Sequence, residues 1–98
     1  LKGEGVIQNF KESLRLFQQA AEQGYPRAQH NLGVAYAGGK GTFRDPVKAH
    51  MWFNLAAANG YPEAAASRER LAASMAQSEI VRAQDSAMEC ADQNFVDC

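Results

Sequence analysis

The sequence is poor in the residue types that most catalytic and metal sites use: it has only two cysteines and two histidines among 98 residues. Ten basic and eleven acidic residues give a net charge of −1, so no basic surface is expected for nucleic acid or anionic lipid. No apolar run approaches the roughly 20 residues that span a bilayer. These absences argue against nucleic-acid binding and against membrane insertion.

What the sequence does contain is a repeat with a period of 36 residues. Nine residues between positions 3 and 28 recur identically 36 positions later: Gly3, Gly5, Phe17, Ala20, Ala21, Gly24, Tyr25, Pro26 and Ala28. A period of this length is typical of helical repeat proteins, in which each unit packs on its neighbours.

Each unit is predicted to contain two helices. The first clear helix begins after Asn9, an N-cap residue that Glu12 completes as a capping box, and it ends at Gly24. Its predicted buried stripe consists of Phe10, Ser13, Leu14, Leu16, Phe17, Ala20 and Ala21. Further helices are predicted from Pro26 to Ala37, from Asp45-Pro46 to Gly60, from Pro62 to Met75 and from Gln77 to Ala91.

The chain is expected to form one domain that covers residues 1–98. Residues 1–24 form a partial repeat, 25–60 a complete repeat, and 61–98 a degenerate repeat with a C-terminal cap. Arg15 and Gln19 recur 36 residues later as Met51 and Leu55, so the second long helix is apolar where the first is polar. We therefore expect the C-terminal helices to cover Met51 and Leu55.

The start at Leu1 indicates a fragment or a mature product.

The repeat resembles the Sel1-like repeat of the tetratricopeptide-like superfamily. The residues that carry the resemblance are Ala28, Leu32, Gly33, Tyr36, Gly39, Gly41, Asp45, Lys48, Ala49, Trp52, Ala56, Ala57 and Gly60. Leu16 departs from the pattern, where tryptophan is usual. The resemblance implies an all-α, right-handed superhelical solenoid of antiparallel helix pairs. It also implies a protein-interaction scaffold, here the C-terminal portion of a bacterial member.

A solenoid leaves one concave wall free for a partner, and the first helix of each unit is expected to line it. On a helical wheel, six residues fall opposite the core stripe of these helices: Arg27, His30, Asn31, Val34, Glu63 and Arg70. We expect this face to bind another protein or a peptide. The alternative is that the same residues form an ordinary solvated face.

No catalytic residue, metal ligand or cofactor site is recognisable, and no enzyme activity is predicted. Two alternatives to the interaction scaffold remain. One is a cell-wall-related ligand-binding protein or hydrolase of the penicillin-binding, cysteine-rich type, which a cluster of His30, a serine and a carboxylate would support. The other is a module that self-associates as a homo-oligomer through its N-terminal face, around Val6, Ile7, Phe10 and Leu14.

The two cysteines, Cys90 and Cys98, both lie in the last nine residues, with Asp92-Gln93-Asn94 between them as a candidate turn. A disulfide is the favoured interpretation, and two free buried thiols are the alternative. A disulfide predicts a periplasmic or secreted protein of the bacterial envelope, whereas free thiols would fit a cytoplasmic one.

Overall fold

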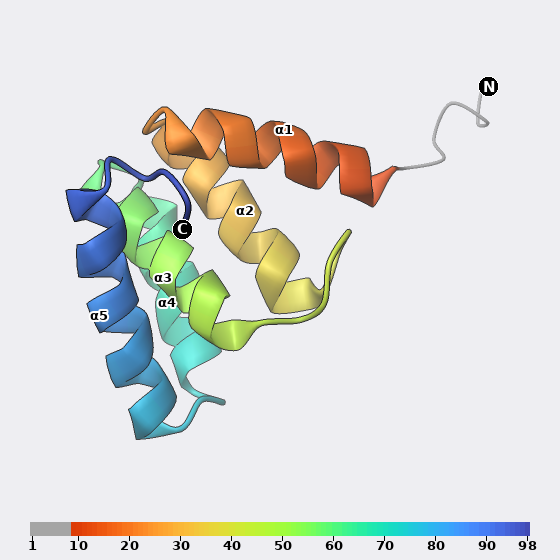
Figure 1. Cartoon of the computed structure of the whole chain (residues 1–98). Coiled ribbons are helices and arrows are strands. Elements are labelled where there is room, and N and C mark those ends of the chain that lie inside the picture. Colours follow the sequence, from red (N-terminus) through yellow and green to blue (C-terminus); the bar gives the residue numbers. More distant parts are fainter. Residues whose placement is uncertain (1–8) are drawn as a thin grey trace.

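The computed structural model describes residues 9–98, and these residues form helices without strands. The five helices are α1 (Phe10–Glu22), α2 (Pro26–Gly38), α3 (Pro46–Ala58), α4 (Pro62–Ala72) and α5 (Gln77–Asp92). Consecutive helices reverse direction (Figure 1). The predicted all-helical class is confirmed for this part of the chain. None of the helices described is both long and apolar enough to cross a membrane.

Helices α1 and α3, the second helices of their units, start where the capping residues predict. The Asn9 side chain accepts a hydrogen bond from the Glu12 backbone N–H at 3.0 Å, and Asp45 does the same for Lys48 at 3.0 Å. The predicted capping box at Asn9 is wrong in one respect. The Glu12 carboxylate pairs with Arg15 in the next turn and does not return to the backbone of Asn9.

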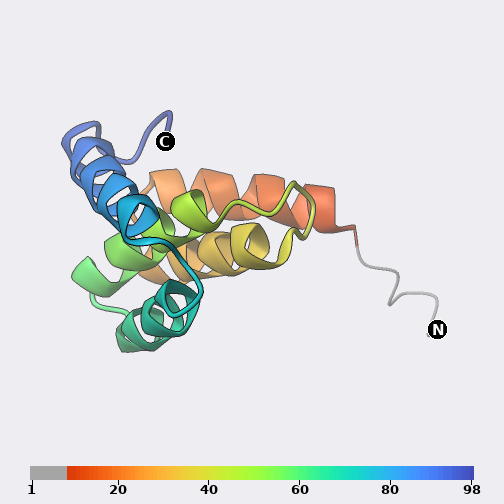
Figure 2. The same cartoon turned by 90° about the horizontal axis from the view of Figure 1, so that it is seen from below.

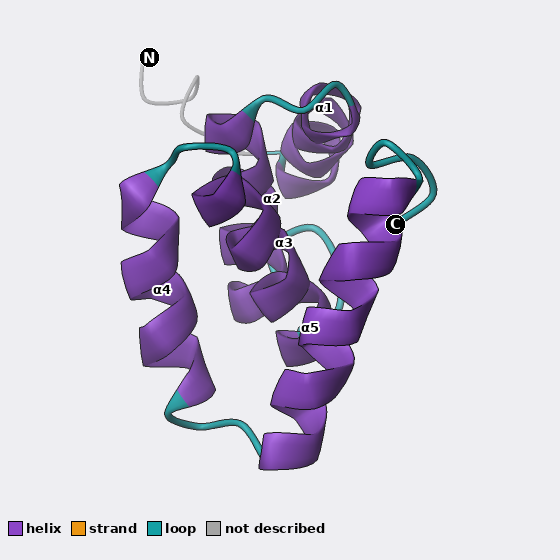
Figure 3. Cartoon of the chain, turned by 90° about the vertical axis from the view of Figure 1, so that its left-hand side faces the viewer, coloured by secondary structure: helices purple, strands orange, loops and turns teal. Residues whose placement is uncertain are grey.

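Helix α3 forms the centre of the fold, because it packs against α2, α4 and α5 (Figure 2). Helices α4 and α5 lie on different sides of it (Figure 3). Met51 and Leu55 are each only 4% exposed and belong to the same buried cluster as Cys90 of α5. The prediction that a C-terminal helix covers this side of α3 is therefore confirmed. The cluster consists of Ala21, Leu32, Met51, Trp52, Leu55 and Cys90.

The predicted buried stripe on α1 is wrong in part, because only Ala21 is fully buried and two of its members, Phe10 and Leu16, are exposed. Leu16 is 50% exposed, whereas Trp52, which occupies the same position in the next unit, is fully buried. The two positions differ in exposure because different numbers of helices surround α1 and α3. Helix α3 is enclosed by three helices, whereas α1 packs mainly on α2 in the described structure. Phe10, at the start of α1, is likewise 42% exposed.

The C-terminal tail folds back over the end of α5. Cys90 and Cys98 are joined by a disulfide, with their Cα atoms 5.5 Å apart. Between them, Phe95 packs against the core cluster and lies beside the turn that ends α1. A Cβ atom built on Gly24 in that turn would be 3.3 Å from the Phe95 ring. The tail therefore contacts the first repeat as well as the last helix.

A close helix contact depends on Gly33, on the side of α2 that faces α3. A Cβ atom at this position would lie 2.6 Å from the Phe53 ring and 3.2 Å from the Ala49 carbonyl oxygen. We expect Gly33→Ala to lower the free energy of unfolding by about 1–3 kcal/mol, because the helices must separate to accept the methyl group.

The matched control for Gly33→Ala is Gly38→Ala, at the end of the same helix. There the nearest atom to the new Cβ is 3.5 Å away, on the flexible side chain of Lys40. This substitution is expected to be neutral or to stabilise by up to about 1 kcal/mol. Urea unfolding of both variants measures the difference, and equal effects at the two positions would contradict the contact argument.

Candidate protein-binding face

The six residues predicted to line the concave wall lie on α2 and α4, and we refer to them as the α2–α4 face: Arg27, His30, Asn31, Val34, Glu63 and Arg70. Arg27, Glu63 and Arg70 are exposed, and Val34 is 39% exposed. Asn31 and His30 are half-buried. The face therefore carries two positive charges and one negative charge with a small apolar patch, which suits polar recognition of a protein surface.

His30 on α2 forms the contact between α2 and α4. Its Nε2 atom lies 2.9 Å from the Ser67 Oγ on α4. Its ring also packs against two aromatic rings, with centroid distances of 5.4 Å to Phe53 and 5.0 Å to Tyr61. The sequence placed His30 opposite the core stripe, but it did not indicate that Ser67 would hold it there. His30 therefore links α2 to α4 and is less exposed than Arg27 or Arg70.

The pairing of His30 with Ser67 is the one feature of this face that nucleophilic catalysis could use. A working base needs a third group to orient its imidazole, and His30 Nδ1 is buried without a hydrogen-bond partner among the described residues. Arg70 already donates a hydrogen bond to Ser67 Oγ at 3.2 Å. The carboxylate that would complete the predicted cluster is thus not bonded to the imidazole, and this geometry does not favour the hydrolase alternative.

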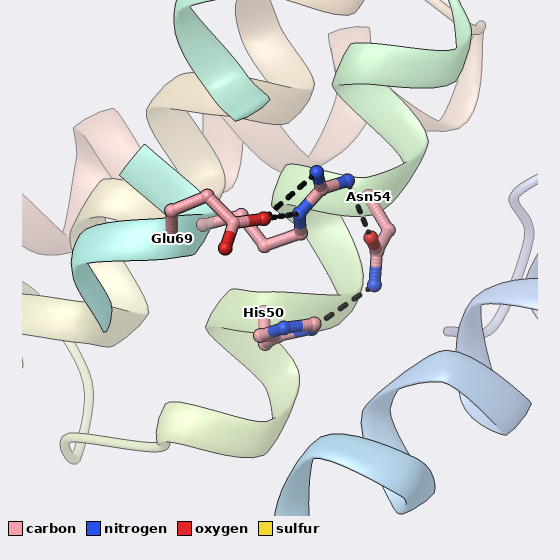
Figure 4. Close-up of polar contacts among 4 residues, drawn as sticks. His50, Asn54 and Glu69 are labelled. Atoms are coloured by element: carbon pink, nitrogen blue, oxygen red, sulfur yellow. Dashed lines mark hydrogen bonds and ion pairs between the residues drawn. The ribbon is translucent and has the colours of Figure 1, made fainter. Parts of the chain in front are cut away.

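A second histidine lies in a polar chain between α3 and α4 (Figure 4). Arg68 donates to the Asn54 carbonyl oxygen at 3.0 Å, which turns the Asn54 amide N–H towards His50 Nδ1 at 3.0 Å. Arg68 also forms an ion pair with Glu69 at 3.1 Å. His50 is only 2% exposed and accepts the bond from Asn54, so it is held as a neutral imidazole.

Both histidines make the fold sensitive to acid. Burial lowers the pKa of His50 below its ordinary value of 6.5, with a further contribution from Arg68 that Glu69 partly opposes. Burial also lowers the pKa of His30, although the neighbouring Asn31 side chain and the Glu63 charge oppose this shift, and the Arg70 charge adds to it. Because the unfolded chain binds these protons more readily, stability is fully present above pH 6.5 and is lost as the pH falls towards the folded pKa values.

We therefore expect the free energy of unfolding to fall between pH 7.5 and 5.5, by at most about 1.4 kcal/mol per pH unit for each histidine. Urea unfolding at several pH values measures this slope. The control is the His30→Asn/His50→Asn double variant, for which the slope should be nearly flat. An unchanged slope in that variant would assign the pH dependence to other groups.

An open groove lies between α1 and α2, and its cavity volume is about 350 Å³. We call it the α1–α2 groove, and its lining residues are Phe10, Ser13, Leu14, Phe17, Asn31, Val34, Ala35 and Lys40. The Lys40 ammonium group lies 5.8 Å from the centre of the Phe10 ring at one end. Phe10 and Leu14 belong to the face predicted for self-association, whereas Val6 and Ile7 lie outside the described residues.

Within residues 9–98, no group of three or more histidine, cysteine, aspartate and glutamate side chains could hold a metal ion.

The comparison with protein families agrees with the repeat and the helix pairs. The family model for the Sel1 repeat matches residues 1–25 and 26–61, which together cover more than half of the chain. The chain belongs to the Sel1 repeat family. Sel1 repeats generally mediate interactions between proteins, and the second match corresponds to the unit formed by α2 and α3.

One curated relative that contains a matching segment is chitin synthase regulatory factor 3 of Schizosaccharomyces pombe. It is 36% identical to this Sel1 repeat chain over 75 residues. The alignment covers 76% of the chain but only 8% of the relative. The likeness therefore concerns the repeat module and not the whole of that regulatory protein.

Proposed function

We propose that the chain is a protein-interaction scaffold that binds a partner protein or peptide through the α2–α4 face. The proposal rests on the contact between α2 and α4, the equivalent helices of two units, through His30 and Ser67. Arg27, Glu63 and Arg70 on these two helices are exposed. Membership of the Sel1 repeat family supports it, and so does the regulatory role in the name of the fission-yeast relative. No catalytic step is assigned to this face.

We also propose that the chain works in an oxidising compartment, such as the bacterial periplasm or the extracellular space. The disulfide between Cys90 and Cys98 supports this location, because such bonds persist where thiols are not kept reduced. Mass spectrometry of the protein purified from its source, before and after reduction, tests the proposal. Recovery of the native protein with two free thiols would favour the cytoplasmic alternative.

The binding proposal is tested by reversing charge on the α2–α4 face. We expect the Arg27→Glu/Arg70→Glu double variant to lose a specific partner by at least about tenfold in retained amount, when immobilised wild-type and variant chains capture proteins from the source organism. Circular dichroism and thermal unfolding check that the variant is folded.

Arg82→Glu is the control for this charge reversal, because Arg82 is exposed on α5, which lies on a different side of α3 from α4 (Figure 3). It makes one of the same charge changes and should retain the partner. Equal retention by all three proteins would show that the α2–α4 face is not the binding surface.

A further inference from the structure

An apolar groove lies between α3 and α5, and its cavity volume is about 320 Å³. We call it the α3–α5 groove, and its lining residues are Asn54, Leu55, Ala58, Gln84, Ala87, Met88 and Ala91. No charged side chain is among them. Met88 is 65% exposed, so the packing of α5 on α3 leaves most of its side chain uncovered within residues 9–98.

The stacking of repeat units does not account for this apolar surface. The α3 residues of the groove correspond, 36 positions earlier, to three polar residues of α1, which are Gln18, Gln19 and Glu22. Gln18 donates a hydrogen bond to Glu22 at 3.0 Å. The equivalent surface of the first unit is thus polar, as expected of a face that meets water. Burial under α5 explains Leu55, which is 4% exposed, but it does not explain Met88.

Two acidic residues of α5 border the groove. Asp85 precedes Met88 by three residues and Asp92 follows it by four, so both carboxylates are neighbours of the Met88 side chain on the helix surface. Both are exposed, and neither forms an ion pair within residues 9–98. Arg68, which bonds to Asn54 on the α3 side, is already neutralised by an ion pair. The rim of the groove therefore carries negative charge that no described group balances.

Negative charge is concentrated in this part of the chain. Residues 77–98 contain five acidic residues and one basic residue, a net charge of −4. Residues 1–76 contain nine basic and six acidic residues, a net charge of +3. The total of −1 thus conceals a separation of charge along the sequence.

The acidic residues at the end of α5 are unfavourable for the helix itself. Glu89 and Asp92 lie in its last turn, and no basic residue lies there with them. Negative charge at the C-terminal end of a helix opposes the helix dipole. A local arrangement that lowers stability without a compensating contact is typical of a functional surface. The charge on this surface favours a positively charged partner.

We propose that the α3–α5 groove binds a basic amphipathic helix of a partner protein. Asp85 and Asp92 are seven residues apart, which is two helical turns and about 10 Å along the axis. A helix that lies along α5 meets them with two lysine or arginine residues at the same spacing. An apolar residue between these two rests on Met88, whose flexible thioether side chain adapts to it.

The direct test titrates a synthetic alanine-rich helix into the full 98-residue chain labelled with ¹⁵N. The peptide carries a leucine, with one lysine three residues before it and another four residues after it. We expect saturable binding with a Kd below about 1 mM and chemical-shift changes at Leu55, Gln84, Met88 and Ala91. Binding should weaken when salt is raised from about 50 to about 300 mM. A control peptide with glutamate in place of both lysines should bind at least about tenfold more weakly.

Asp92→Asn separates recognition from stability. It should weaken binding of the lysine peptide about three- to tenfold, because one charge pair of the complex is lost. It should also raise Tm slightly, since a charge that opposes the helix dipole is removed. The control is Asp97→Asn in the tail, where asparagine accepts the positive φ of 60°. It removes the same charge away from Met88 and should leave binding unchanged.

Met88→Gln tests the apolar contact. The substitution keeps the length of the side chain but makes its end polar, so it should weaken peptide binding at least about fivefold. Because Met88 is largely exposed, the variant should remain folded, which circular dichroism checks. The control is Val96→Gln, at a tail residue that is 46% exposed, and it should leave binding unchanged.

Several outcomes would overturn the proposal. They are no saturable binding at about 1 mM peptide, equal binding of the lysine and glutamate peptides, or equal effects of Met88→Gln and Val96→Gln. A dimer of the free chain that Met88→Gln converts to a monomer, seen by light scattering, would assign the groove to a second copy instead. The inference goes beyond the proposed function, because the groove shares no residue with the α2–α4 face. Charge reversal at Arg27 and Arg70 leaves the groove intact, so failure of either surface can be told from failure of the other.

Discussion

Replacing Trp52 by alanine is expected to lower the free energy of unfolding by about 3–5 kcal/mol. The indole is fully buried at the centre of the cluster that unites α1, α2, α3 and α5. Its removal leaves a cavity where four helices meet, and the disulfide at one edge limits how far the surroundings can collapse. For a domain of about 100 residues this loss corresponds to a fall in Tm of at least about 12 °C.

The matched control for Trp52→Ala is Leu16→Ala, at the same position of the other unit. Leu16 is half-exposed, so its truncation should change the free energy of unfolding by less than about 1 kcal/mol. Thermal and urea unfolding of the two variants give the comparison. If both substitutions destabilised the chain equally, the conclusion that the core is centred on α3 would be wrong.

Reduction of the disulfide is expected to destabilise the chain by about 2–3 kcal/mol. Cys90 and Cys98 are eight residues apart in sequence, so the bond closes a short loop and restricts the unfolded chain. Reduction also frees the tail that holds Phe95 against the core. We therefore expect a fall in Tm of about 8–20 °C when dithiothreitol is added, together with faster amide hydrogen exchange in α5 and around Gly24.

The control for reduction is the Cys90→Ser/Cys98→Ser double variant. Its Tm should be low with or without dithiothreitol, because it has no bond to reduce. An unchanged Tm of the wild-type chain on reduction would mean that packing of Phe95 holds the tail without the disulfide. A fall in Tm of the serine variant on adding dithiothreitol would assign the effect to the reagent.

Much of the fold follows from local signals in the sequence. Asn9 and Asp45 mark helix starts because their side chains satisfy free backbone N–H groups, and this depends only on residues three positions away. The burial of Met51 and Leu55 could be predicted because the repeat supplies a comparison with Arg15 and Gln19. A change from a polar to an apolar residue between equivalent positions indicates that another helix packs against the apolar position.

Other features depend on contacts that no local pattern carries. The position of Leu16 within an apolar stripe predicts burial, but burial also needs a helix on that side. Nothing in the sequence distinguishes Ser67 from the other serines, because its contact with His30 depends on how α4 packs in the fold. Gln29 is fully buried, where it donates to the Ala21 carbonyl oxygen at 3.1 Å and accepts from Asn59 at 2.9 Å. A glutamine in an alanine-rich helix gives no sign of that role, because its partners are far apart in sequence.

The contact between Phe95 and the turn at Gly24 changes how the chain is expected to unfold. In an open repeat array each unit touches only its neighbours, so the ends fray and units can open one after another. Here Phe95 in the C-terminal tail packs against the turn that ends α1. Unfolding of α1 would therefore expose the tail, and release of the tail would expose the end of α1. The short array should therefore behave as a cooperative unit, with a single transition for all five helices.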